Sequence, residues 1–224
     1  MRRPLIVAAL LAGCTIAAHA EDTSYTDWRI GYTFPGKRGI VDETIDGSTV
    51  TYSDAWDVTG RVFTDVDHVW QPGILGLTFG GGLAFEDRRR SPRADGAGPP
   101  GFKGGKNKGP IMKYNVYQGH ISAGPTLRLG DWGTLELLLH AGIGAATFAI
   151  EFQGVATSST NPYYESGADL ALIIADGTDS PFIGLSVGGI SSYSLHKMKL
   201  QGYDVTYEIY NNDFSASLFV GYRF

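Results

Sequence analysis

Residues 114–129 read YNVYQGHISAGPTLRL, and this stretch decides the fold. Apolar residues such as Tyr117 and Ile121 alternate in it with polar residues such as His120 and Ser122. Side chains of a strand point to opposite faces with a period of two, whereas a helix would mix the two sets on each face. The stretch therefore predicts one long strand with an apolar face and a polar face.

The same period recurs along the chain after residue 21. It predicts eight strands, at 24–35, 48–64, 72–88, 113–129, 134–152, 164–175, 182–198 and 206–224. Each is long enough for the roughly 9–11 residues with which a tilted strand crosses a bilayer. Short polar links, among them 65–71, alternate with longer or more irregular links at 36–47, 89–112, 153–163 and 199–205. We predict an all-β fold, an eight-stranded antiparallel up-and-down transmembrane β-barrel, with both termini on the periplasmic side.

The composition agrees with strands that have two unlike faces. The 224 residues include 31 Gly and 12 Tyr, and only 18% of them are charged. Beyond the N-terminal segment, no apolar run approaches the roughly 20 residues of a membrane-spanning helix. A membrane protein of this composition must be a barrel, because only helices and closed barrels satisfy every backbone hydrogen bond in hydrocarbon.

The N-terminus has the pattern of an export signal. Arg2 and Arg3 precede an apolar stretch that ends in the small-residue site AHA, so we expect cleavage after Ala20. The predicted domains are a removed signal peptide, 1–20, and an outer-membrane β-barrel, 21–224. The sequence LAGC, ending at Cys14, resembles a lipobox and leaves lipidation as the alternative. Cleavage after Ala20 would leave no cysteine, and thus no thiol chemistry, in the mature chain.

Polar residues of the predicted strands are expected to fill the interior, because eight strands leave a lumen just wide enough for side chains. The predicted inward set is Arg29, Asp57, Arg61, Glu86, His120, Arg128, Glu136, His140, Asp169 and Arg223. Unpaired charges in so narrow a space are costly, so we interpret the set as a structural network of ion pairs and hydrogen bonds. A proton relay or an ion path is the alternative.

Aromatic residues are expected where strands end. Amphipathic rings settle at the headgroup level of a membrane, and the predicted girdle is Trp28, Trp56, Trp70, Trp132, Tyr114, Tyr117, Tyr193 and Tyr222. Internal aromatic packing is the alternative. The chain also ends on one apolar face, formed by Phe214, Ala216, Leu218, Val220, Tyr222 and Phe224. This resembles the terminal-strand signal that the barrel-assembly machinery reads in bacterial outer-membrane proteins, with Tyr222 and Phe224 as its aromatic residues.

Two patches of sequence are similar to one family. The first comprises AGP at 123–125, Arg128 and DW at 131–132, and runs into a Gly-rich strand; the second is the ending GYRF at 221–224. They resemble the outer-membrane protein X and Ail/Lom attachment–invasion family. The resemblance implies a small surface-exposed barrel whose strands stand above the membrane. It also implies a role in adhesion, serum resistance or envelope integrity, with host surface proteins among the partners.

Basic residues crowd into one stretch of an otherwise acidic chain, which has a net charge of −5. They are Arg88, Arg89, Arg90, Arg93, Lys103, Lys106 and Lys108. On an external loop they would face lipopolysaccharide phosphates, which Arg can pair in a bidentate way. A solvated spacer is the alternative, since Gly and Pro dominate the loop, and no aromatic ladder suggests nucleic acid.

A hydrolase arrangement must be weighed, because Ser194 and His196 share one face of a predicted strand and Glu208 lies on the next. Small barrels that deacylate lipid A use such residues in the order His-x-Ser, whereas the order here is Ser-x-His. The alternation also points these side chains inward or above the membrane. The histidines have no metal-ligand spacing, and we expect neither metal nor cofactor.

The sequence therefore favours a monomeric, non-enzymatic integral outer-membrane protein of a Gram-negative bacterium. Its role would be structural, adhesive or in other surface interactions. The expected partners are outer-membrane lipids and lipopolysaccharide, the barrel-assembly machinery during biogenesis, and host surface proteins, but no nucleic acid. A lipid A-modifying enzyme of the deacylase type and a narrow channel for ions or small solutes are the alternatives.

Overall fold

The computed structural model describes residues 23–36, 39–53, 55–90, 110–152 and 154–224. The expected signal peptide and Cys14 lie outside these ranges and stay predictions. Within the ranges, no helix is long and apolar enough to cross a membrane. The described elements are the strands β1 (Thr23–Pro35), β2 (Gly39–Ile45), β3 (Ser48–Tyr52), β4 (Val58–Gln71), β5 (Leu75–Arg90), β6 (Ile111–Arg128), β7 (Gly133–Phe152), β8 (Val155–Ala175), β9 (Ser180–Leu200) and β10 (Tyr203–Arg223).

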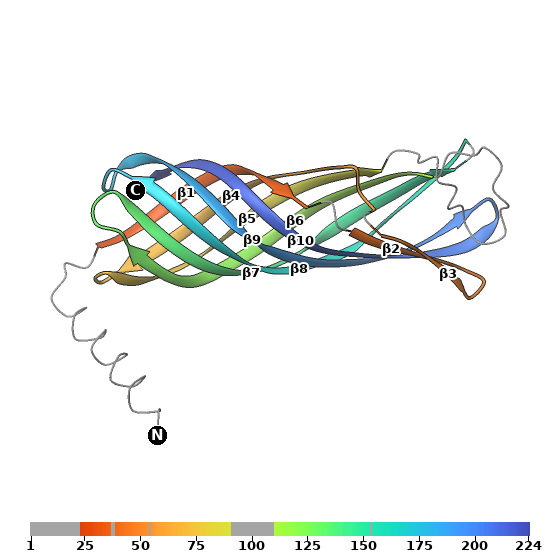
Figure 1. Cartoon of the computed structure of the whole chain (residues 1–224), viewed down its shortest axis with the longest axis horizontal. Coiled ribbons are helices and arrows are strands. Elements are labelled where there is room, and N and C mark those ends of the chain that lie inside the picture. Colours follow the sequence, from red (N-terminus) through yellow and green to blue (C-terminus); the bar gives the residue numbers. More distant parts are fainter. Residues whose placement is uncertain (1–22, 37–38, 54, 91–109, 153) are drawn as a thin grey trace, which may run out of the picture.

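Eight of these strands form a closed ring (Figure 1). Their order is β1, β4, β5, β6, β7, β8, β9 and β10, every pair is antiparallel, and β1 pairs with β10 to close the ring. When the cross-strand partners are followed once around the ring from Tyr210 of β10, the last partner is Val220 of the same strand. One circuit therefore shifts the register by ten residues. Such a stagger accompanies the strand tilt that closure requires. The predicted eight-stranded antiparallel barrel is confirmed.

The first half of the chain departs from the predicted strand boundaries. The predicted strand 48–64 is wrong, because 48–52 belongs to the β2–β3 hairpin while the ring strand is β4, at 58–71. The expected turn at 65–71 is therefore part of β4. Asp65 and Asp67 point into the lumen from this strand, and two charges so close together look like a turn in a sequence.

Two predicted irregular links are also wrong, because strands continue through them. β8 begins at Val155, and β9 and β10 are separated only by Gln201 and Gly202. The backbone φ angles of these two residues are 51° and 92°. Two successive residues with positive φ are the mark of a type I′ hairpin turn, whose twist matches that of the flanking strands.

The outer surface near the termini is apolar. Large apolar side chains on this surface are exposed, and they form what we call the belt: Ile30, Val62, Val66, Leu77, Phe79, Leu83, Ile121, Leu137, Leu139, Ile143, Leu170, Leu185, Val187, Leu218 and Val220. Trp28, Trp70 and Trp132 are exposed at its terminal side, as the predicted girdle requires. Trp56 and Tyr114 are not part of any girdle, because they are buried and stacked on one another inside the molecule. A continuous apolar outer surface of this kind is that of a barrel that spans a membrane.

The opposite end, which we call the distal head, has the reverse arrangement. It comprises β2, β3, and residues 111–116, 145–152, 155–163, 192–200 and 203–211. An apolar core fills its interior, with Val41, Met112, Phe148, Ile150 and Ile209 among its buried members. Polar side chains are exposed on its outside, including Thr49, Ser158, Thr160, Lys197, Lys199 and Asp204. The head is therefore built like a water-soluble β-protein, and β2 extends its wall by pairing with β10 beyond the end of β1.

Candidate functional site

The polar lumen of the belt region contains two networks of buried charges. The first lies toward the termini and centres on Arg29, whose Nε is 2.8 Å from Asp67 Oδ2 and whose Nη2 donates to Glu136 Oε2 at 2.8 Å. Next to it, Arg223 binds both carboxylate oxygens of Asp27 at 2.9 Å. These side chains are nearly inaccessible to solvent, so the pairs must compensate for their desolvation with good geometry.

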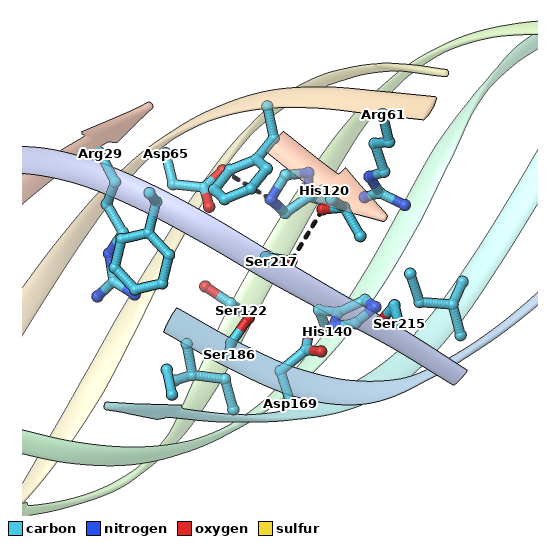
Figure 2. Close-up of a pocket in the computed structure, with 16 residues that line it drawn as sticks. Arg29, Arg61, Asp65, His120, Ser122, His140, Asp169, Ser186, Ser215 and Ser217 are labelled. Atoms are coloured by element: carbon cyan, nitrogen blue, oxygen red, sulfur yellow. Dashed lines mark hydrogen bonds and ion pairs between the residues drawn. The ribbon is translucent and has the colours of Figure 1, made fainter. Parts of the chain in front are cut away.

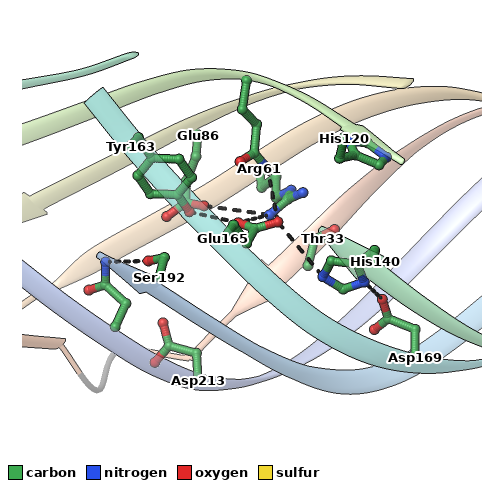
Figure 3. A network of polar contacts seen from close by, with 12 residues as sticks. Thr33, Arg61, Glu86, His120, His140, Tyr163, Glu165, Asp169, Ser192 and Asp213 are labelled. Atoms are coloured by element: carbon green, nitrogen blue, oxygen red, sulfur yellow. Dashed lines mark hydrogen bonds and ion pairs between the residues drawn. The ribbon is translucent and has the colours of Figure 1, made fainter. Parts of the chain in front are cut away.

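The second network lies toward the distal head (Figure 3). Arg61 donates to Glu165 Oε2 at 2.7 Å, and the same carboxylate accepts hydrogen bonds from Tyr163 at 2.6 Å and Gln118 at 3.0 Å. Further out, Arg88 connects two more carboxylates: its Nε donates to Glu86 Oε1, and its Nη1 donates to Asp213 Oδ2 at 2.6 Å. The two guanidinium groups thus link four strands of the ring, β4, β5, β8 and β10, across the lumen.

A small cavity of about 70 Å³ lies between the two networks (Figure 2). Two histidine–aspartate pairs line it: His120 Nε2 is 2.9 Å from Asp65 Oδ1, and His140 Nδ1 is 3.1 Å from Asp169 Oδ2. Serine hydroxyls from Ser186 and other positions complete the polar lining. A polar cavity of this size is large enough to hold bound water. This is a site for bound solvent, far too small for an organic substrate.

The distal head closes the lumen at its other end. The indole of Trp56 stacks on Tyr114, with ring centroids 5.6 Å apart, and Phe148 packs on Tyr207 at 4.9 Å. These rings belong to the apolar core that fills the head. Among the described residues, the interior thus passes from ion pairs to a packed hydrocarbon core, an arrangement suited to a structural plug.

Most of the predicted inward residues lie in the lumen. Arg29, Arg61, Glu86, His120, Glu136, His140, Asp169 and Arg223 make the contacts described above. Asp57 does not lie on a ring strand: it precedes β4, and its backbone N–H donates to Arg89 O. Arg128 is the last residue of β6, where its half-exposed side chain pairs with Asp131 at the rim. The alternation assigns a face correctly, but it does not show where along the barrel a strand leaves the lumen.

Sequence reasoning missed several network members, namely Asp27, Asp65, Asp67, Arg88, Glu165 and Asp213. Counting by twos along the correct strands would have found them. Asp65 and Asp67 follow Arg61 at this period, and Glu165 precedes Asp169 by four residues. The signal was present, and the misplaced strand boundary in the first half of the chain hid the two aspartates.

The expected basic loop is partly a strand. Arg88 and Arg90 lie on β5 with their side chains buried, and the Arg90 guanidinium lies 4.9 Å from the centre of the Tyr52 ring. Only Arg89, 61% exposed and paired with Asp87 at 2.9 Å, faces outward among the described members. The remaining four, Arg93, Lys103, Lys106 and Lys108, lie outside the described residues. The expectation that Arg88 and Arg90 lie on an external loop, available to a polyanion, was wrong, because β5 runs two residues further than the predicted strand and buries both side chains.

The Ser194 and His196 pair lies inside the distal head. Ser194 Oγ is 3.1 Å from His196 Nε2 and 2.8 Å from the Tyr114 hydroxyl, and both residues are fully buried. Burial lowers the pKa of His196 to about 4, so the imidazole is neutral at neutral pH. Glu208 is on the outer face, where it accepts a hydrogen bond from Tyr210. The three residues therefore do not form a hydrolase triad, and the inner pair serves to satisfy polar atoms in the core.

A buried carboxylate anchors the β2–β3 hairpin to the head. Glu43 accepts hydrogen bonds from the Tyr52 hydroxyl at 2.7 Å and from the Tyr207 hydroxyl at 2.6 Å. Burial and the adjacent carboxylate raise the pKa of both tyrosines well above the ordinary value. Both hydroxyls therefore remain donors. The Tyr52 bond joins β3 to β2 within the hairpin, and the Tyr207 bond connects the hairpin to β10.

The C-terminal aromatic residues lie on the outer surface at the terminal rim. Phe224 is exposed, and its backbone exchanges hydrogen bonds with Thr26 at 2.9 Å and 3.2 Å. The Tyr222 hydroxyl donates to Asp179.

In the described residues, no group of three or more His, Cys, Asp or Glu side chains is arranged to hold a metal ion.

No family model and no curated protein matches the chain. Solved structures do. The crystal structure of Ail, the attachment invasion locus protein of Yersinia pestis, is 20% identical, with 90% of this chain and 99% of that chain covered and a TM-score of 0.34. Ail in complex with the heparin analogue sucrose octasulfate is 19% identical over similar shares, with a TM-score of 0.32. The Pseudomonas putida toluene transporter TodX is 8% identical, covers 93% of this chain and 91% of its own, and has a TM-score of 0.25.

The chain resembles the outer-membrane protein X and Ail/Lom family. The sequence patches at 123–132 and at the C-terminus indicated this resemblance. At such identities and TM-scores the matches concern the fold alone.

Proposed function

We propose that this chain is a non-enzymatic outer-membrane protein that holds the distal head above the membrane for surface interactions. The observation that carries the proposal is the reversal of polarity along the barrel. The belt is apolar outside and polar inside, whereas the distal head is polar outside and apolar inside. Such a wall fits lipid at one end and water at the other, so the head must project from the bilayer.

The proposal includes an orientation. The short turns and the termini lie in the periplasm, and the head lies at the cell surface, as long distal strands and short terminal turns favour. Residues 1–20 act as the signal peptide, and the barrel-assembly machinery recognises Tyr222 and Phe224. The finished barrel is a monomer, because closure of the ring leaves no free edge in the belt.

The packed interior favours a structural and interaction role over a channel or an enzyme. A solute would have to displace the Arg61–Glu165 pair and then the stacked rings of Trp56 and Tyr114. A lipid A deacylase would need its nucleophile on the lipid-facing surface, and Ser194 is buried inside the head.

The expected partners are polyanions at the cell surface, first of all lipopolysaccharide, and host surface proteins. Arg89 and its cross-strand neighbour Lys113 are exposed on the outer face, and the predicted loop adds Arg93, Lys103, Lys106 and Lys108. Exposed cations of this kind pair phosphate oxygens, although screening limits each contact.

Two measurements test the proposal. Single cysteines placed in the β9–β10 turn at Gln201 and in the terminal turn at Gly130 should differ, with only the first labelled by an impermeant maleimide on intact cells. Binding of purified barrel to immobilised deacylated lipopolysaccharide should weaken in an Arg89→Ser/Arg93→Ser variant and with rising salt, while Lys197→Ser/Lys199→Ser serves as the matched control. Labelling of the Gly130 site alone would overturn the orientation. Equal binding by wild type and both variants would overturn the polyanion role.

A further inference from the structure

A hollow in the lipid-facing wall stands apart from the lumen. It has a volume of about 480 Å³ and crosses β1, β4, β5 and β6 on the outer surface. The side chains that border it are Ile30, Val62, Leu83, Phe85 and Tyr117. All five belong to the exposed apolar surface, so the hollow opens directly to the hydrocarbon of the bilayer.

The hollow exists because two small residues interrupt a row of large ones. Ile30, Thr64, Leu83 and Gly119 are successive partners across the four strands. Gly119 has no side chain to fill the surface, and a Cβ built there would meet only Gly82 O at 3.8 Å and Leu83 Cδ2 at 3.9 Å. The depression is therefore set by the sequence of the strands, and a Cβ at position 119 would make only ordinary van der Waals contacts.

Two cations lie on the distal side of this hollow, on the same two strands. Phe85 and Tyr117 form its distal border, with ring centroids 4.8 Å apart. Four residues further along the strands, Arg89 of β5 lies directly opposite Lys113 of β6 in the strand ladder. Four residues of strand span about 13 Å. Asp87 lies on β5 between Phe85 and Arg89, and its ion pair with Arg89 neutralises one of the two positive charges. Asp87, Arg89 and Lys113 together therefore have a net charge of +1.

We propose that this wall is a binding site for lipid A, with one acyl chain in the hollow and a phosphate at Arg89 and Lys113. The inference deepens the proposed function and rests on its orientation, because only a distal leaflet facing the cell exterior contains lipid A. An apolar hollow adjoining the belt fits an acyl chain, and the paired cations above it fit an anionic headgroup. Both parts lie on β5 and β6, so one molecule can occupy them together.

The binding of an acyl chain is tested by filling the hollow with a larger side chain. Gly119→Leu should lower the fraction of purified barrel that retains hexa-acylated lipid A in native mass spectrometry about tenfold, the effect of expelling roughly two methylene groups. Gly189→Leu is the matched control, because Gly189 is an exposed glycine on β9 whose Cβ would meet only Asp213 O at 3.9 Å. Equal lipid A retention by wild type and Gly119→Leu, or equal loss of lipid A in both variants, would overturn the binding of an acyl chain in the hollow.

The headgroup contact is tested by removing its cations. Arg89→Ser/Lys113→Ser should weaken lipid A retention about fivefold, against no change for Lys197→Ser/Lys199→Ser. Phosphatidylglycerol is the competing lipid in a parallel titration, and tighter binding of phosphatidylglycerol than of lipid A would overturn the choice of occupant. Deacylated lipopolysaccharide cannot use the hollow. Failure of the wild-type barrel to bind deacylated lipopolysaccharide would contradict the polyanion role alone, whereas unchanged lipid A retention in Gly119→Leu would contradict only the lipid A site.

Discussion

The belt region and the distal head are made of the same strands, and they assign the two faces of those strands in opposite ways. Along β7, Leu137 and Leu139 point outward in the belt, while Thr147 takes the outward position in the head. The inward positions change from Glu136 in the belt to Phe148 in the head. Alternation decides which residues share a face, but the surrounding solvent decides which face is apolar.

The interiors of the two regions are stabilised by different forces. The belt region encloses charges whose partners must all be present, because a buried ion without its partner is severely destabilising. The head encloses hydrocarbon, for which burial itself is favourable. A substitution at the outer surface should therefore have a different cost in the two regions even where strand and side chain are similar, and the two interiors should be sensitive to different changes.

The largest effect is expected at the polar interior. Arg88→Ala leaves Glu86 and Asp213 without their shared partner and should lower the free energy of unfolding by about 3–5 kcal/mol. Arg89→Ala changes the next residue, which is exposed, and should cost about 0.5 kcal/mol or less. Denaturant titrations of barrel folded in lipid vesicles measure both. Similar costs would show that the ion pairs of Arg88 do not stabilise the barrel.

The next effect concerns the outer surface. Leu137→Arg places a cation in the belt and should cost about 2–4 kcal/mol if the residue is near the bilayer midplane. Thr147→Arg places the same cation on the same face of β7 ten residues further along, in the head, and should cost about 0.5 kcal/mol or less. The comparison requires refolding into lipid vesicles, since the cost arises from hydrocarbon. Equal costs would place position 147 in the membrane as well.

A pH effect is expected from His196 in the head. The pKa of His196 is lowered to about 4 by burial, whereas a histidine in the unfolded chain titrates near 6.5. Between these values the unfolded chain binds a proton that the folded chain does not, so stability is complete above the upper value and is lost as pH falls. From pH 7 to pH 5 this amounts to about 2 kcal/mol. The loss should be absent from His196→Gln, measured as the difference in unfolding free energy at the two pH values; an unchanged slope would mean that another group is responsible.

The sequence predicted the barrel and most of the lumen because both follow from a period of two. It failed where a strand carries charges that resemble a turn, as with Asp65 and Asp67, and where a strand continues beyond the membrane, as in β8 and β9. It also failed at Trp56 and Tyr114, which were expected in a girdle. An aromatic residue near a strand end fits either an interface or a core, and only the reversal of faces in the head distinguishes them.

The smallest effect tests the hydrogen bonds by which the head holds its hairpin. Tyr207→Phe removes one of the two donors to the buried Glu43 carboxylate, and Tyr52 alone cannot replace it. A lost hydrogen bond to a buried charge should cost about 1.5 kcal/mol here, because the Tyr52 donor remains. Tyr210→Phe, three residues further along β10, removes an exposed bond to Glu208 and should cost less than about 0.5 kcal/mol. Hydrogen exchange of the β2 amides should accelerate only in Tyr207→Phe, because β2 is the strand that carries Glu43. Unchanged exchange in that variant would mean that pairing with β10 holds the hairpin without the carboxylate.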